Sequence, residues 1–446
     1  MESVERVGGT APTTTPPPPA INLSVSRRNV ALFVADAAIF SFALSFLDLS
    51  SVMPTLLSHL TRLPLWFGLL GSIQTGCWLL PQIFVARLVG AQRRKLPIVI
   101  LGTTLSRFSW LFLVVGLVFT NQIGPDLTLV CCYLAVAGFF LFDGVAILPW
   151  YDLLARAVPA SLRGRLFGLL ALGSGITATV GGIIVEHVVG NPSLPYPADY
   201  RLLAIAAVII LMLGVIPLAL VKEAETEEAT PAAEPFKTYF RRLPSLLRQR
   251  PTFRRLVAIQ ILVGISAMAT PFYAPFADLG LGIPESTVGA YIIGVTMGSM
   301  LGGMAWGWIG DHGPKEVPVR IVALAGGLAP LVPIILAFVA RGLPPAILGP
   351  LLALSFFCVG CGVRSGWVAY ANFVMEIATP ADRPTLIGLM NTLSGFLAIV
   401  PPLGGLLAGW LGYEATFLAA SLPALVGLGL SFALRAEPAS ASIAAI

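Results

Sequence analysis

Charged residues are too few in this sequence to cover the surface of a water-soluble protein. Asp, Glu, Lys and Arg make up 11% of the chain, whereas hydrophobic residues make up 57%. A soluble domain carries about 25% charged residues. Lipid must therefore cover most of this chain, and the composition predicts an all-α integral membrane protein.

Residues that hold metals, nucleotides or disulfides are also scarce. The chain has three histidines and five cysteines, and all five cysteines fall inside apolar runs. Cys358 and Cys361 have the spacing of a metal or redox pair, but no second pair of ligands accompanies them. There is no Gly-x-x-x-x-Gly-Lys loop for a nucleotide. We therefore expect no cofactor, no metal site and no enzymatic activity, and we interpret the cysteines as packing residues.

Twelve apolar segments are each long enough to cross a bilayer as a helix, which takes about 20 residues. Turn-rich or charged stretches separate them, such as residues 121–126 between the third and the fourth. The predicted limits are 29–57, 65–90, 96–120, 127–150, 163–188, 200–221, 253–278, 286–309, 317–340, 346–375, 384–410 and 414–434.

Residues near the ends of these segments recur after a fixed interval of 220 positions. Such an interval is too long for a solenoid repeat and fits two homologous six-helix halves joined end to end. In a membrane protein it is typical of a transporter with two bundles related by a parallel pseudo-twofold axis and a site between them. The recurring pairs are Pro64 and Pro284, Gly90 and Gly310, Lys95 and Lys315, Arg163 and Arg383, Gly168 and Gly388, and Leu169 and Leu389.

Positive charge is concentrated on one side of the predicted membrane. If the N-terminus is cytoplasmic, 22 of the 27 Lys and Arg residues face inward, and only Arg62, Arg201 and Arg341 lie in outward loops. The remaining two, Arg107 and Arg364, lie within helices. This asymmetry follows the positive-inside rule, so we predict a multi-pass protein of the cell membrane with both termini in the cytoplasm. It also accounts for the net charge of +5 without a nucleic-acid partner.

Polar stretches flank and connect the two predicted bundles. Residues 1–28 are rich in Thr and Pro and have no apolar core, which predicts a disordered tail. Residues 222–252 begin acidic and end basic with interleaved aromatic and Leu residues, which predicts a flexible linker and an amphipathic helix on anionic lipids of the inner leaflet. The expected bundles are therefore residues 29–221 and 253–435, followed by a C-terminal tail at 436–446.

The loop between the eighth and ninth helices carries a short acidic and basic motif. Residues 307–315 contain a leading Gly, Asp311 and Lys315. The motif resembles the loop signature of the major facilitator superfamily, in which it occurs in both halves. The first copy, at residues 87–95, keeps the basic cluster and lacks the Asp.

The loop after the fourth helix resembles the same family more closely. Residues 152–168 contain Asp152, Arg163 and Arg165, and the counterpart in the second half keeps Arg383. The resemblance implies a cytoplasmic gate or loop at these positions. Arg163 and Arg165 either anchor at lipid head groups or pair with Asp152.

With twelve helices, two halves and a long central loop, residues 25–436 resemble the major facilitator superfamily. The resemblance implies a transporter that works by alternating access. It also implies a central cavity lined by helices one, four, seven and ten.

Five charged residues lie inside the predicted helices, where a charge costs about 2.5–3.5 kcal/mol and usually faces a cavity or a partner. Two of them, Asp36 and Asp143, each lie roughly 10 Å from the inner end of their helix. We predict that one of these carboxylates pairs with Arg107 and that the other is free to carry a proton, the alternative being static ion pairs that fix helix packing. The five are Asp36 and Asp48 in helix one, Arg107 in helix three, Asp143 in helix four and Arg364 in helix ten.

Asp48 is a further candidate for proton coupling. Arg364 is expected to attract either an anionic group of the substrate or an acidic residue of the other half. Prolines interrupt helix one at Pro54 and helix seven at Pro271, and paired interruptions mark a site or a gate. The candidate substrate contacts are Arg364, Gln260, Phe272, Tyr273 and Trp367, and the alternative role of Phe272 and Tyr273 is an outer gate.

Three glycines recur every fourth residue in helix eight, at Gly294, Gly298 and Gly302. Small residues at this spacing let helices approach closely. The resulting flat ridge serves either packing or the sliding of one bundle over the other.

The leading interpretation is a secondary active transporter that moves a small solute and is coupled to protons. An apolar cavity with few charges favours efflux of a drug or metabolite. An uncoupled facilitator of the same fold and a non-transporting assembly or sensor protein are the alternatives. The expected partners are a small solute, protons and anionic inner-leaflet lipids, and the protein is expected to act as a monomer without nucleic acid.

Overall fold

The computed structural model describes residues 23–90, 94–223, 247–378 and 383–435. These residues form helices and connecting turns, with no strand among them. Within the described residues, eleven helical spans are long and apolar enough to cross a membrane. A further helix, Pro64–Gly90, has 27 residues and completes the predicted set of twelve. The prediction of an all-helical, multi-pass membrane protein is confirmed.

Six spans make up the first bundle, and three of them consist of two consecutive helices. They are α1 (Leu23–Ser45) with α2 (Val52–Leu60), α3 (Pro64–Gly90), α4 (Leu96–Ser109) with α5 (Leu111–Val118), α6 (Thr120–Ala157), α7 (Ala160–Val189), and α8 (Ala198–Leu213) with α9 (Val215–Ala219).

Six further spans make up the second bundle, and several contain short 3-10 or π segments. They are α11 (Pro251–Ile265) with η1 (Ser266–Phe272) and α12 (Tyr273–Leu281), η2 (Glu285–Thr287) with α13 (Val288–His312), α14 (Glu316–Val339) with η3 (Ala340–Gly342), α15 (Pro345–Val359) with η4 (Gly360–Arg364) and α16 (Gly366–Ile377), α17 (Arg383–Gly395) with η5 (Phe396–Ile399) and α18 (Val400–Leu411), and α19 (Tyr413–Ser431).

Some helix limits differ from the prediction. Helix α1 begins at Leu23 rather than at residue 29, because the residues after the Pro-rich run contain no helix breaker. Helix α6 begins at Thr120, kinks at Gly124, where φ is +79°, and continues through Pro149 to Ala157. The predicted turn at 121–126 is thus a kink within this helix. Helix α11 begins at Pro251, and most of the linker at residues 222–252, in which an amphipathic helix was predicted, falls outside the described residues.

Interruptions of the first, seventh and tenth spans lie beside the charged and proline residues that the sequence singled out. The first breaks between Ser45 and Val52, and Pro54 occupies the first turn of α2, where a missing N–H costs little. The seventh passes through the 3-10 segment η1, which contains Pro271. The predicted interruptions of helices one and seven are therefore confirmed. The tenth contains a π-helical turn, η4, that the sequence analysis did not predict.

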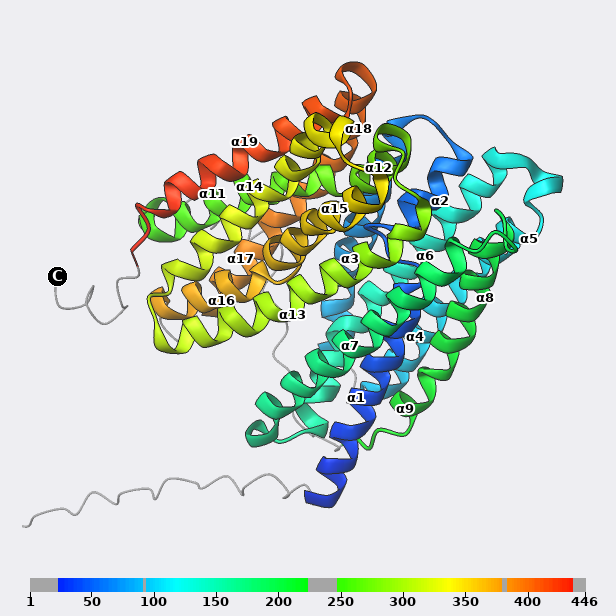
Figure 1. Cartoon of the computed structure of the whole chain (residues 1–446). Coiled ribbons are helices and arrows are strands. Elements are labelled where there is room, and N and C mark those ends of the chain that lie inside the picture. Colours follow the sequence, from blue (N-terminus) through cyan, green and yellow to red (C-terminus); the bar gives the residue numbers. More distant parts are fainter. Residues whose placement is uncertain (1–22, 91–93, 224–246, 379–382, 436–446) are drawn as a thin grey trace, which may run out of the picture.

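The two bundles meet at one end and diverge toward the other (Figure 1). We call the meeting end, formed by α2, α12 and the beginnings of α3 and α13, the closed end. Here α3 packs on α18 and α7 packs on α13. Phe67 of α3 meets Phe272 of η1 with ring centroids 6.5 Å apart. In this conformation the two bundles are therefore in contact at the closed end and diverge toward the opposite end (Figure 1).

Glycines make this closure tight. A Cβ atom added at Gly68 of α3 would lie less than 3.0 Å from the carbonyl oxygen of Pro401, and one at Gly289 would lie equally close to the carbonyl oxygen of Gly182. Both neighbours are backbone atoms of the other bundle, which no side-chain rotation can move. Glycine is required at these two positions by close approach alone.

We expect Gly68→Ala to open the closed end. Its methyl group would overlap the Pro401 backbone, and overpacking of this kind costs about 1–3 kcal/mol. Spin labels on Leu63 and Leu279, which are exposed on different bundles, would report the opening as a longer distance. Gly76→Ala in the same helix meets no atom within 4 Å and should leave the distance unchanged. Equal distances in the two variants would contradict the prediction.

The glycine ridge of helix eight packs inside the second bundle. A Cβ at Gly294 would lie 2.7 Å from the carbonyl oxygen of Ala353, and one at Gly302 would lie 2.5 Å from the Ser365 hydroxyl. Gly298 approaches the backbone of Phe357 in the same way. The ridge therefore lets α13 approach α15 and η4, and it is not a sliding surface between the bundles.

Candidate functional site

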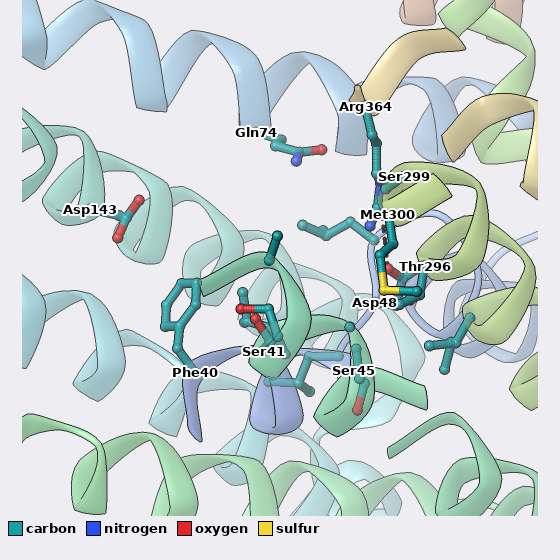
Figure 2. A pocket seen from close by; sticks show the side chains of 18 of the residues that line it. Phe40, Ser41, Ser45, Asp48, Gln74, Asp143, Thr296, Ser299, Met300 and Arg364 are labelled. Atoms are coloured by element: carbon teal, nitrogen blue, oxygen red, sulfur yellow. Dashed lines mark hydrogen bonds and ion pairs between the residues drawn. The ribbon is translucent and has the colours of Figure 1, made fainter. Parts of the chain in front are cut away.

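A cavity of about 500 Å³ lies between the two bundles (Figure 2). Its walls come from α1, α3, α6 and α7 of the first bundle and from α13 and η4 of the second. Helices one, four and ten line it as expected. No described residue of helix seven lines it, and helices two, five and eight contribute instead. The reason is that α11 packs within the second bundle, and η1 packs on α18 and α19 and, at the closed end, on α3.

The cavity has polar groups on two sides and apolar groups between them. Figure 2 shows Asp143 on one side, Arg364 and Asp48 on the other, and Gln74 between. Phe40 supplies apolar wall from the first bundle. The hydroxyl-bearing and apolar residues that the sequence analysis missed are Ser41, Ser45, Phe139, Phe140, Ser174, Thr296, Ser299 and Met300.

Asp143 lines the cavity without a charged partner. Its only described hydrogen bond comes from Trp78 Nε1, at 3.2 Å from Oδ2. The neighbouring Gly144 brings α6 against the backbone of Trp78, which places the indole beside the carboxylate. Among the described residues, no Lys, Arg or His nitrogen lies within 4.0 Å of Asp143. This is the carboxylate of the cavity that is available to a proton or a ligand.

Asp36, and not Asp143, is the carboxylate that pairs with Arg107; from the sequence, either could have done so. Arg107 Nη2 donates to Asp36 Oδ1 at 2.9 Å, and Arg107 Nη1 donates to the carbonyl oxygen of Leu211 at 2.8 Å. The guanidinium lies over the Phe40 ring, 6.0 Å from its centroid. Arg107 is 2% exposed, and neither it nor Asp36 lines the cavity. The pair joins α1, α4 and α8 within the first bundle, which is the arrangement of a static packing contact.

Asp48 and Arg364 connect the two bundles across the cavity. Arg364 Nη2 donates to Asp48 Oδ2 at 2.9 Å and to Ser50 Oγ at 3.2 Å. The other oxygen, Asp48 Oδ1, accepts from the backbone N–H of Ser50 at 2.9 Å, from the Ser50 hydroxyl, and from the Ser51 hydroxyl at 3.0 Å. The break between α1 and α2 thus holds Asp48 in place for a partner from the other bundle.

Four candidate substrate contacts lie outside the cavity. Phe272 and Tyr273 are 0% exposed, and Tyr273 packs on the ring of Phe417 at 5.4 Å. Gln260 donates to the Ser394 hydroxyl at 2.7 Å, within the second bundle. Trp367, on α16, is 65% exposed but does not line the cavity. In this conformation the four side chains do not reach the cavity, because position along a helix does not reveal which side of the helix faces it.

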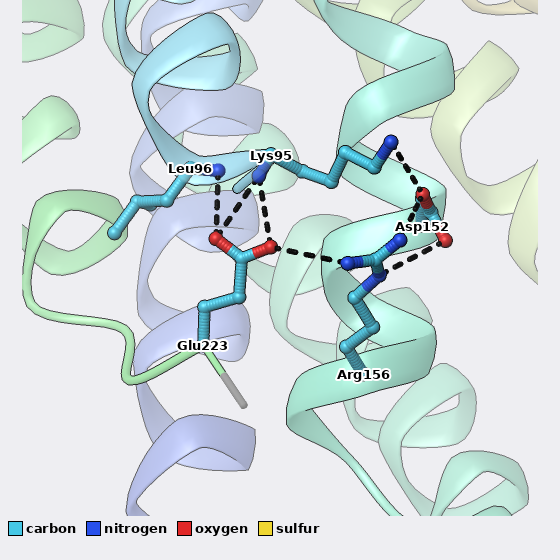
Figure 3. Close-up of polar contacts among 5 residues, drawn as sticks. All are labelled: Lys95, Leu96, Asp152, Arg156 and Glu223. Atoms are coloured by element: carbon cyan, nitrogen blue, oxygen red, sulfur yellow. Dashed lines mark hydrogen bonds and ion pairs between the residues drawn. The ribbon is translucent and has the colours of Figure 1, made fainter. Parts of the chain in front are cut away.

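Around Asp152, the contacts differ from those expected (Figure 3). Lys95 Nζ lies 3.4 Å from Asp152 Oδ2, and Arg156 Nη2 lies 3.2 Å from the same atom. Glu223 accepts from the backbone N–H groups of Lys95 and Leu96 and so caps the beginning of α4. This network ties α4, α6 and the segment after α9 together inside the first bundle.

The other predicted gate residues do not join this network. Arg163 donates to the carbonyl oxygens of Ala155 and Val158, and Arg165 is exposed, so the predicted pairing of either with Asp152 is wrong. Lys315 donates to the carbonyl oxygen of Gly310. The side chains of Asp311 and Arg383 fall outside the described part of the chain.

A second contact between the bundles lies at the closed end and was missed by the sequence analysis. His59 Nε2 of α2 lies 2.8 Å from Glu285 Oε1 of η2. The imidazole stacks on Tyr196 with ring centroids 4.3 Å apart, and the Tyr200 hydroxyl donates to Glu285 Oε2 at 3.2 Å. The other charged groups that act on this cluster are Asp199 of α8, Asp278 of α12, and Arg62, which acts through Asp278.

We expect the closed end to loosen as the pH rises. Burial lowers the pKa of His59, but the hydrogen bond and negative charge of Glu285 outweigh it and raise this pKa above its ordinary value of about 6.5. Protonated His59 therefore favours the shut conformation. This contribution is complete below the ordinary pKa and is lost as the pH rises through the raised value. The label distance between Leu63 and Leu279 should lengthen over that range.

His59→Gln should remove this pH-dependent step, and Glu285→Gln should move its midpoint to lower pH. His187→Gln is the matched control, because His187 is exposed on α7 and bonds only the carbonyl oxygen of Ile183 among the described residues. A midpoint that is the same in His59→Gln as in the unmodified protein would show that another group titrates.

Comparison with known proteins agrees with this architecture. The family model described as Major Facilitator Superfamily matches residues 36–400. The chain matches no curated protein sequence.

Several solved structures share the fold of the chain. A mutant form of the nucleoside transporter NupG has a TM-score of 0.66 at 12% identity, covering 92% of this chain and 99% of that one. A bacterial homologue of the human lysosomal transporter Spinster, inward-facing and unoccupied, has a TM-score of 0.60 at 12% identity, covering 92% and 96%. The human organic anion transporter MFSD10 has a TM-score of 0.53 at 18% identity, covering 93% and 100%.

Proposed function

The chain belongs to the major facilitator superfamily and is a multi-pass membrane transport protein, and from this premise we propose that it is a proton-coupled secondary transporter that works by alternating access. The small solute binds in the cavity between the bundles. The proton binds at Asp143, and the two bundles rock about the cavity to expose it to each side of the membrane in turn.

Asp143 is the observation that carries this proposal. It lines the interbundle cavity and has no cation beside it among the described residues. The two other intramembrane aspartates are held by Arg107 and Arg364. A carboxylate in a membrane that is neither paired nor lipid-facing usually belongs to an ion or substrate pathway. Proton binding and release at Asp143 require no salt bridge to break.

The orientation of the protein is part of the proposal. The few outward basic residues, Arg62, Arg201 and Arg341, lie in loops or helix ends on the side of the closed end. Most Lys and Arg residues lie toward the diverging end, which by the positive-inside rule faces the cytoplasm. The structure then corresponds to an inward-facing conformation in the cell membrane, with both termini in the cytoplasm.

The proposal is tested by proton flux in liposomes that contain the purified chain and a trapped pH-sensitive dye. Outwardly or inwardly directed gradients of nucleosides, short peptides and small organic acids would be applied, because proteins of this fold are named for such solutes. Coupled transport changes the internal pH for at least one solute, and protein-free liposomes do not respond. Solute flux without proton flux would identify a facilitator, and no flux for any solute would favour a non-transporting protein.

A further inference from the structure

The π-helical turn η4 carries Arg364 into the contact between the bundles. A π turn inserts an extra residue into a helix and is frequent at functional sites. Gly360 and Gly362 make room for it: a Cβ at Gly360 would lie less than 3.0 Å from the Val295 backbone, and one at Gly362 would lie 3.2 Å from the Gly326 nitrogen. The turn is thus wedged between α13 and α14, and it positions an arginine rather than relaxing into α-helix.

Arg364 has donors left for a ligand. Its described hydrogen bonds, to Asp48 and to Ser50, both come from Nη2. A guanidinium carries five N–H donors arranged as a planar fork that matches a carboxylate. The side chain is 42% exposed and lines the cavity, so Nη1 and Nε are available to a bound molecule.

Asp48, in contrast, has little capacity left. It is 9% exposed, and its two oxygens accept from Ser50, Ser51 and Arg364. Ser50 and Ser51 can keep Asp48 hydrogen-bonded when the arginine turns away. Movement of Arg364 therefore opens the ion pair while Oδ1 keeps its donors, and Oδ2 loses the one described hydrogen bond that the ligand's carboxylate takes over from it.

The charges around the cavity limit what the ligand can be. Asp48 and Asp143 are acidic and Arg364 is the one base among the residues that line it, so a doubly charged phosphate would meet net repulsion. A monocarboxylate needs only one guanidinium. Phe40, Phe139, Phe140 and Met300 offer an apolar surface for the rest of the molecule.

We propose that Arg364 binds the carboxylate of an organic monocarboxylic acid with an apolar body, and that this carboxylate takes Arg364 from Asp48 and so releases a tie between the bundles. This inference rests on the proposed transport function. An ionised Asp143 would repel the anion, so binding is favoured once Asp143 carries a proton. One acid anion and one proton then move together, without net charge.

The test compares acids with their uncharged amides in the purified full-length chain. Benzoate, phenylacetate and octanoate would be added at matched concentrations with benzamide, phenylacetamide and octanamide. The readout is the distance between labels on Leu63 and Leu279 at the closed end. At least one acid should lengthen the distance more than its amide does. If every acid behaves as its amide does, the proposal is overturned.

Variants locate the effect at the ion pair. Arg364→Lys keeps the positive charge but loses the fork, and its half-maximal acid concentration should rise at least about tenfold, as expected for one lost hydrogen bond to a charged group. Arg364→Gln should abolish the response. Asp48→Asn should open the closed end without acid, and acid should add nothing further. Arg201→Gln, which changes an arginine outside the cavity, should respond as the unmodified protein does.

A full response in Arg364→Gln would overturn the assignment. Arg364→Lys keeps a positive charge beside Asp48. If the glutamine variant does not fold, the acid concentration at half-maximal response in Arg364→Lys still tests the assignment. The assay contains no proton gradient. Loss of proton coupling in liposomes with an intact acid response would therefore count against the proposed function alone.

Discussion

Replacing Asp143 by asparagine is expected to abolish transport driven by a pH gradient. Asparagine has the same shape and can still accept the hydrogen bond from Trp78, but it cannot bind and release a proton. With one proton per solute, a gradient of one pH unit supports about tenfold accumulation. In the variant, the accumulation ratio should fall to about one under the same gradient.

Exchange of solute should survive in this variant, because it needs the cavity and the rocking of the bundles but no proton. Uptake of labelled solute into liposomes that contain unlabelled solute measures it. Asp126→Asn is the matched control, since Asp126 lies on the same helix, is exposed and does not line the cavity. Accumulation that persists in Asp143→Asn would remove this residue from the proton pathway.

Removing the carboxylate of Asp36 is expected to destabilise the first bundle strongly. In Asp36→Ala, the guanidinium of Arg107 stays buried without its ion-pair partner, and such a loss costs about 3–5 kcal/mol. Arg107 Nε already has no hydrogen-bond partner among the described residues, so none of them supplies a compensating contact. Unfolding by titration with a denaturing detergent measures the change in the free energy of unfolding.

The double variant Asp36→Leu with Arg107→Met should regain most of this stability. It removes both charges and fills the space with apolar groups, and replacement of a buried ion pair in this way is often neutral or stabilising. Asp126→Ala, at an exposed position, should change stability by less than about 0.5 kcal/mol. A double variant as unstable as Asp36→Ala would mean that the pair does more than neutralise charge.

These two predictions separate the roles of two carboxylates that look alike in the sequence. Both lie in apolar helices at a similar distance from the inner end. From the sequence, either of them could pair with Arg107. In the structure, Asp36 points to α4 and α8 inside the bundle, while Asp143 points to the cavity. The two carboxylates differ in the direction in which they point around their helix axes. The depth of a residue in the membrane does not reveal that direction.

The aromatic residues of helix seven show the same limit. The prolines of this segment correctly predicted an interruption. Tyr273 nevertheless packs inside the second bundle, and Phe272 meets Phe67 at the closed end, so neither lines the cavity. Conversely, Gln74, an amide within an apolar run, could have been noticed as a candidate, since polar groups in a membrane helix need a partner or a cavity.

The sequence by itself determined the number and order of the membrane helices, the division into two halves and the interruptions of helices one and seven. These features follow from local properties, because a bilayer sets the length of an apolar run and a proline removes a backbone donor. The family followed from short loop motifs together with this count. Only the tertiary structure decided which charges meet. Asp48 and Arg364 are 316 residues apart, and His59 and Glu285 are 226 apart. Their contacts form because glycines such as Gly68 and Gly289 let the two bundles approach closely. Which residues then meet depends on how two distant segments pack together, and neither segment's sequence specifies this alone.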